Sequence, residues 1–237
     1  MIEIFDLLEF QIMIAARQMK SYYGFSADHE PKPEEVYYAV YQMAHRGILK
    51  KQGQDLVIQE PVASYMNGIM NARNLLIVDR GSYVLPRQSI YYDEKEERYI
   101  CIENSNTAQN QVCLSGWKEE EFFCQMKDLN QLPDEKQKED LVEKDILLYW
   151  KNHMTEDMQN LINQNLNMQT EDLLEQKQIH TVFSDIDKKN GKLKRRMILL
   201  DLSFEYGMLI QETDKNVELN VYSREKALAI LKNWWRK

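Results

Sequence analysis

An internal repeat constrains the fold of this 237-residue chain more than any other feature of its sequence. At one constant offset, the first block of the repeat matches Asp79, Arg87, Ile90, Asp93, Glu97 and Ile102 with Asp187, Arg195, Ile198, Asp201, Glu205 and Ile210. After a loop shortened by three residues, a second block matches Val112, Leu114, Trp117, Phe123 and Met126 with Val217, Leu219, Tyr222, Leu228 and Leu231. We therefore predict two related halves, residues 1–132 and 133–237, joined in one globular unit. The alternative is a chance likeness, because strand-turn-strand patterns resemble one another.

The first half reads as helices followed by a sheet. Apolar residues at helical spacing predict helices at 3–20, 33–49 and 61–74, and Gly53 marks the turn of a short hairpin at 50–60. Strands are predicted at 75–79, 87–93, 97–103 and 110–115, and a closing helix at 117–128. The turns between these strands are charged or Asn-rich, which favours antiparallel hairpins and an α+β fold.

The second half repeats this order with longer helical segments between residues 134 and 178. Its strands are predicted at 179–187, 194–201, 206–211 and 217–221, and its closing helix at 223–235. Asn190-Gly191 is a strong signal for a tight hairpin between the first two of these strands. Of the two tryptophans that end the helix, we expect one to cover the core and the other to be exposed.

Composition predicts a cytoplasmic protein without a membrane span. The chain is 43% hydrophobic, which is enough to form a substantial core, but it has no run of about 18 apolar residues. Acidic residues stand near the N-terminus where a signal peptide has basic ones. The three cysteines form no CxxC pair, and for Cys101 and Cys113 on neighbouring predicted strands we favour buried reduced thiols over a redox pair. The net charge of −8 argues against general nucleic-acid binding.

Catalytic motifs are absent from the sequence. It contains no Gly-rich phosphate loop, no HExxH and no GxSxG, and its four histidines stand apart. We therefore expect a protein that is not an enzyme and that has no cofactor and no metal site. One basic run, residues 192–196, stands out against the acidic background. It fits either the charged edge or turn end of a hairpin, or a contact with an acidic partner.

Residues 33–60 suggest one alternative function. A helix that leads into a small hairpin is the layout of a winged-helix DNA reader, here a transcriptional regulator with a C-terminal sensing or dimerisation domain. The helix is poor in Arg and Lys, however, so direct DNA reading is disfavoured.

The order of elements resembles the EspG family of type VII (ESX) secretion chaperones. The resemblance rests on Leu7 to Phe10 in the first helix, on the helix end Arg46 to Leu49 with the following Asp-Leu-Val-Ile strand, and on the strand-strand-helix pattern that ends at Leu132-Pro133. This chain is shorter than typical members of the family and richer in Lys, Gln and Asn. Its composition resembles that of a relative from a low-GC Gram-positive bacterium. The resemblance implies two pseudo-two-fold related halves, each with helices, an antiparallel sheet and a closing helix. It also implies a cytoplasmic, non-enzymatic chaperone that keeps a helical secretion substrate soluble until export.

A broad sheet face can receive a helical hairpin through alternate side chains. We predict that such a partner-binding face is formed by Tyr91, Tyr99, Leu200, Leu202, Phe204 and Met208, together with the Gln- and Asn-rich helix around Asn163 and Met168. The alternative is that these strand residues point into the core, and alternation requires this of half of them.

Overall fold

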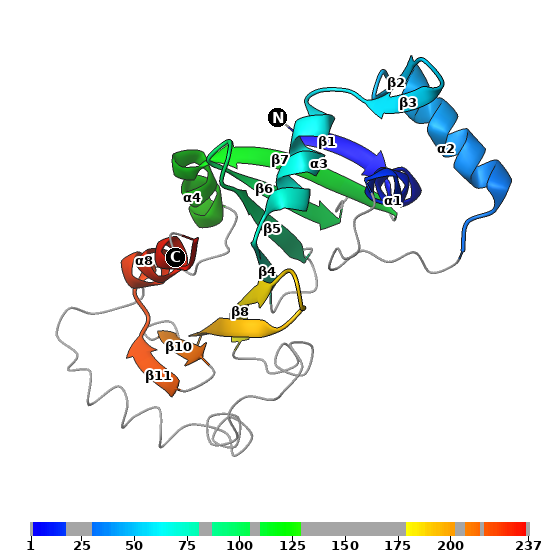
Figure 1. Cartoon of the computed structure of the whole chain (residues 1–237). Helices are drawn as coiled ribbons and strands as arrows, with labels where there is room; N and C mark the ends of the chain where they lie inside the picture. Colours follow the sequence, from blue (N-terminus) through cyan, green and yellow to red (C-terminus); the bar gives the residue numbers. More distant parts are fainter. Residues whose placement is uncertain are drawn as a thin grey trace. The chain divides into compact units, whose positions relative to one another are not determined.

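The computed structural model describes residues 2–17, 30–80, 87–104, 110–128, 179–201, 207–213 and 216–235 (Figure 1). These residues form a mixed α+β structure, which confirms the predicted class. The chain divides into two compact units, one of Met1–Leu75 with Pro86–Phe122 and one of Leu76–Leu85 with Phe123–Lys237. The expected boundary between residues 132 and 133 lies outside the described residues.

The first unit begins with a strand, so the predicted helix at 3–20 is wrong in its first turn. Strand β1 (Ile2–Asp6) pairs antiparallel with β7 (Gln111–Lys118), and only then does helix α1 (Leu7–Ala16) begin. The backbone N–H of Leu7 still donates to the carbonyl of Asn110 at 2.7 Å. A partner strand this far along the chain supplies hydrogen bonds that a local helical pattern does not reveal.

The next elements follow the prediction. Helix α2 (Pro33–His45) leads into a hairpin of β2 (Leu49–Gln52) and β3 (Asp55–Ile58), and helix α3 (Val62–Asn71) comes after it. Gly47 follows the end of α2 with a φ of 76°, a left-handed conformation that glycine adopts without strain. This turn directs the chain from α2 into the hairpin.

The sheet of the first unit has the strand order β1-β7-β6-β5, with β5 at Gln88–Asp93 and β6 at Arg98–Asn104. Helix α3 packs on β5 and β6. Its Gly68 lies so close to the sheet that a Cβ atom there would stand 2.6 Å from Oδ2 of Asp93. Asp93 is buried and accepts a hydrogen bond from Arg98 at 3.2 Å, and Arg98 also donates to Ser64 of α3 at 2.6 Å. Arg98 therefore links α3 to the sheet, because it donates to Ser64 of the helix while it pairs with Asp93 of β5.

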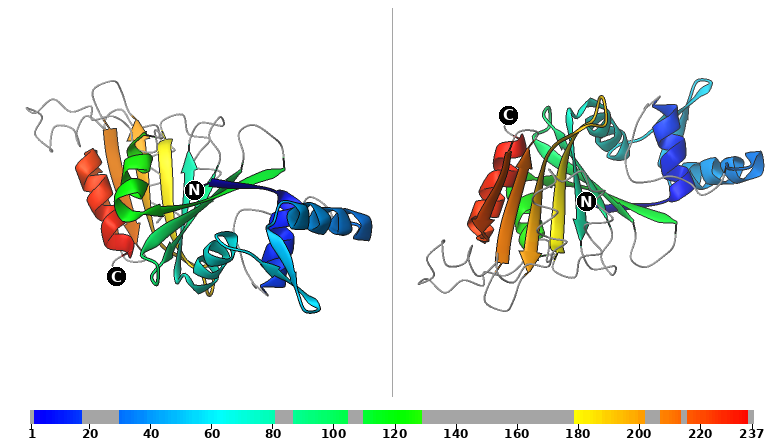
Figure 2. Two further views of the ribbon diagram at one scale, coloured as in Figure 1. Left: turned by 90° about the horizontal axis from the view of Figure 1, so that it is seen from above. Right: turned by 90° about the horizontal axis from the view of Figure 1, so that it is seen from below.

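The second unit contains most of β4 (Asn74–Arg80), then β8 (Ile179–Asp187), β9 (Leu193–Asp201), β10 (Gly207–Thr213) and β11 (Asn216–Val221), in the order β4-β8-β9-β10-β11. Helix α4 (Glu119–Asp128) begins in the first unit and ends in the second. Helix α8 (Arg224–Trp235) runs alongside β10 and β11 in both views of Figure 2.

Both tryptophans of α8 are buried, which corrects the expectation of one exposed ring. The Arg195 guanidinium lies 5.0 Å from the centre of the Trp234 ring and donates to the Trp234 carbonyl at 2.7 Å. The Trp235 ring packs edge-on against Phe123 at 6.3 Å between ring centres. Trp234 therefore has a cationic partner and Trp235 an aromatic partner within the second unit.

Strand pairing within the two units follows the sequence repeat in one ladder. Ile102 of β6 pairs with Leu114 of β7, and the aligned residue Ile210 of β10 pairs with the aligned residue Leu219 of β11. The preceding ladder differs by one position, because Ile90 pairs with Cys101 whereas Ile198 pairs with Ile210. Of these two ladders, only the β6–β7 and β10–β11 pairing therefore keeps the aligned residues opposite each other.

Candidate functional site

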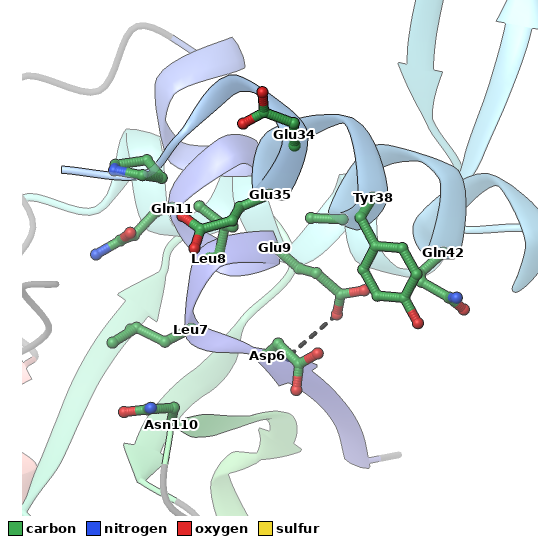
Figure 3. Close-up of a pocket in the computed structure, with 12 residues that line it drawn as sticks. Asp6, Leu7, Leu8, Glu9, Gln11, Glu34, Glu35, Tyr38, Gln42 and Asn110 are labelled. Carbon is green, nitrogen blue, oxygen red and sulfur yellow. Dashed lines mark hydrogen bonds between the residues drawn. The ribbon is translucent and has the colours of Figure 1, made fainter. Parts of the chain in front are cut away.

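A cavity of about 500 Å³ lies between helices α1 and α2 of the first unit (Figure 3). Among the described residues, Leu7, Leu8 and Ala39 give it apolar walls, and Tyr38 closes one side. Carboxylates of Asp6, Glu9, Glu34 and Glu35 also line it, whereas none of its described lining residues is basic. The volume falls within the range of clefts that hold ligands or the side chains of a partner.

The α1 side of the cavity is held in place by an ion pair. Oε2 of Glu9 accepts a hydrogen bond from the backbone N–H of Asp6 at 3.0 Å and also pairs with the guanidinium of Arg46. Arg46 donates in addition to the carbonyl of Ile4 at 3.1 Å and lies 5.8 Å from the centre of the Phe5 ring. The Glu9 side chain is only 3% exposed, so its charge is compensated internally and it positions the helices.

The outer surface of α2 carries three tyrosines that are largely exposed. Tyr37, Tyr38 and Tyr41 have 79%, 65% and 64% of their surface in contact with solvent. Tyr41 stacks on His45 at 6.3 Å between ring centres, and Tyr38 borders the cavity (Figure 3). Exposed tyrosines gathered on one helix are typical of protein-binding surfaces, because each ring supplies a large contact area at low cost in conformational entropy.

Sequence reasoning missed this surface. The signal for it was a row of tyrosines at positions 37, 38 and 41 that face outward while Ala39 and Met43 of the same helix are buried. Two of these tyrosines are four residues apart, so they share one helix face. The N-terminal strand β1 adds two exposed side chains, Ile2 and Ile4, to the apolar surface of this unit.

The predicted partner-binding face is only partly described by the structure. Tyr91, Tyr99 and Leu200 are buried, in agreement with the alternative that strand residues alternate into the core. Tyr99 stacks on Phe122 at 4.2 Å between ring centres. Leu200 and Met208 are brought opposite each other in the β9–β10 ladder. Leu202, Phe204, Asn163 and Met168 lie outside the described residues.

The basic run at 192–196 begins at the turn end of the β8–β9 hairpin, which agrees with one part of the hairpin alternative, and it does not form a sheet edge. Strand β9 lies between β8 and β10, and Nε of Arg195 donates to Oδ2 of Asp185 at 2.7 Å. Burial raises the pKa of the Asp185 carboxyl above its ordinary value of 3.8 despite this hydrogen bond from Arg195. Arg196 is buried 3.8 Å from Glu212, and burial lowers the pKa of its guanidinium. The two arginines therefore serve the packing of the second unit.

In the part of the chain that the structure describes, no group of three or more His, Cys, Asp or Glu side chains is placed to hold a metal ion. None of the described helices is both long and apolar enough to cross a membrane. The chain matches no protein-family model, and no curated protein matches it either.

Proposed function

We propose that this protein is a protein-binding adaptor whose cavity between α1 and α2 receives a helical segment of a partner. One observation carries the proposal, namely the exposed tyrosines of α2 beside an apolar cavity of about 500 Å³. Two packed helices leave a groove between their ridges, and a third helix fills such a groove with its apolar face. The proposal includes no catalytic step, no cofactor and no metal.

Within this class, we propose a cytoplasmic chaperone for a helical substrate of a type VII-like secretion system. The resemblance of the element order to EspG-type chaperones supports it. A secreted helical hairpin with an apolar tip needs a partner that covers the tip until export, and an aromatic surface next to an apolar cavity is suited to that task.

The winged-helix alternative has one observation in its favour, because α2 runs directly into the β2–β3 hairpin. The exposed side of α2, however, carries Glu34, Glu35 and the three tyrosines. Phosphate contacts require basic side chains on the reading helix, so we favour a protein partner over DNA. Salt-sensitive binding to duplex DNA, lost on changing Lys50 and Lys51 of the hairpin, would reverse this preference.

The experiment is an affinity purification of the tagged protein from its native cell, followed by mass spectrometry. A Tyr38→Ser/Tyr41→Ser variant is compared with a Leu56→Ser/Met70→Ser variant, in which two other exposed apolar side chains of the same unit are changed. We expect a small helical protein in near-equal amounts with the unmodified protein and the Leu56/Met70 variant, and little with the tyrosine variant. Equal recovery with all three proteins would refute the proposed site.

A further inference from the structure

From the charges around the cavity we infer that its occupant is an amphipathic helix whose apolar face is flanked by lysines or arginines. This inference rests on the proposed function and adds the chemistry of the partner. Apolar walls alone accept any apolar helix face, so the distinction between partners must come from the rim.

The rim of the cavity is acidic among the residues that the structure describes. Asp6, Glu34 and Glu35 are exposed there and contribute three negative charges. Glu30 and Lys32, on either side of Pro31, carry opposite charges and offset each other. The N-termini of α1 and α2 contribute only about half a positive charge each, so the described lining of the cavity keeps its acidic character.

The pair formed by Glu9 and Arg46 does not change this result, because the two charges compensate each other inside the first unit. Glu34 lies in the first turn of α2, and Glu35 of the same turn accepts a hydrogen bond from the backbone N–H of Lys32 at 2.8 Å. That bond holds the Glu35 carboxylate at the rim. The net charge of −8 of the whole chain adds a field that attracts cationic partners.

A peptide fits this site better than a small cation does. The tyrosine surface of Tyr37, Tyr38 and Tyr41 continues outward from the cavity along α2 and is exposed over its whole length. A ligand the size of the cavity would leave most of that surface uncovered. A helix that places two or three apolar side chains in the cavity, at positions i, i+3 or i+4 and i+7, would also cover the rings. Its flanking basic side chains would then meet Asp6, Glu34 and Glu35.

Two designed peptides of about 18 residues test the inference, since this length gives five helical turns. Both have the same leucine face, and the flanking positions are lysines in one and glutamates in the other. Fluorescence anisotropy measures their binding to the full chain. Two or three exposed ion pairs predict binding of the lysine peptide about tenfold tighter at low salt, and the difference shrinks as salt screens the rim.

The Glu34→Lys/Glu35→Lys variant is expected to remove or reverse this preference. The matched control is Glu120→Lys/Glu121→Lys in the first turn of α4. Glu121 accepts a hydrogen bond from the backbone N–H of Lys118 at 3.2 Å, just as Glu35 does from Lys32, so both variants lose the same helix-start contact. The control protein should retain the preference for the lysine peptide.

Three other outcomes are decisive. Equal binding of both peptides that is lost in the Tyr38→Ser/Tyr41→Ser variant would overturn the charge inference and leave the proposed groove intact. A preference that persists in the Glu34→Lys/Glu35→Lys variant would also overturn the inference. Binding of neither peptide, or binding that the tyrosine variant does not change, would overturn both the inference and the proposed groove.

Discussion

Replacing Gly68 by alanine sets two opposing effects against each other inside α3. In a helix interior, alanine is favoured over glycine by about 1 kcal/mol, so propensity alone predicts a more stable protein. The new Cβ would however stand 2.6 Å from Oδ2 and 2.9 Å from Cγ of Asp93, and it would also meet Ile100. Asp93 is held by Arg98 and Ile100 is fully buried, so neither neighbour moves easily.

Overpacking against buried neighbours costs about 3 kcal/mol, the upper part of its usual range, because one of them is ion-paired. The expected result for Gly68→Ala is therefore a net loss of about 2 kcal/mol in the free energy of unfolding, measured by urea denaturation with far-UV circular dichroism. Asn67→Ala, at the neighbouring and partly exposed position, is the control and should gain about 0.5 kcal/mol from propensity.

A double-mutant cycle tests the cause. Ile100→Val removes the methyl group nearest the new Cβ and by itself should cost about 1 kcal/mol. In combination with Gly68→Ala, the total loss should be smaller than the sum of the single losses by about 1 kcal/mol. A stabilised Gly68→Ala protein, or strictly additive losses, would refute the packing argument.

Three further predictions concern charged and reactive side chains. Arg46→Ala should lower the free energy of unfolding by about 3 kcal/mol, because it leaves Glu9 buried without its partner. Adding Glu9→Gln to the same protein should restore part of this loss in urea denaturation. A double variant that is no more stable than Arg46→Ala would contradict the explanation. Burial lowers the pKa of Lys188 from 10.5 to about 8, so the unfolded chain holds more protons between these values and stability should rise with pH there. Lys188→Met should abolish that rise and Lys189→Met should keep it. Exposed Cys124 should react with a maleimide before the other two thiols, and mass spectrometry of a brief labelling should find it first.

Much of the fold follows from local patterns in the sequence. Apolar runs of strand length predicted every described strand of the two units except β1, and the Asn190-Gly191 and Gly53 turns predicted two hairpins that the structure contains. Residues that the repeat aligns also occupy matching positions in the β6–β7 and β10–β11 ladders. These features depend on residues that are close together in the sequence, so they can be predicted from the sequence alone.

Other features depend on partners distant in sequence. Residues Ile2 to Asp6 are a strand because β7 pairs with them, although their pattern suits the start of a helix. Tyr91, Tyr99 and Leu200 are buried, and alternation along a strand does not say which of its two faces other elements cover.

By itself, therefore, the sequence determined the α+β class and the two hairpins, because the apolar runs and turn residues that specify them are local. Only the tertiary structure decided where a partner could bind. The cavity exists because Arg46 joins the end of α2 to Glu9 of α1, and the tyrosines of α2 are exposed because no other described element covers that side. Burial and exposure are properties of packed elements, and they emerge only when residues far apart in the chain are brought together.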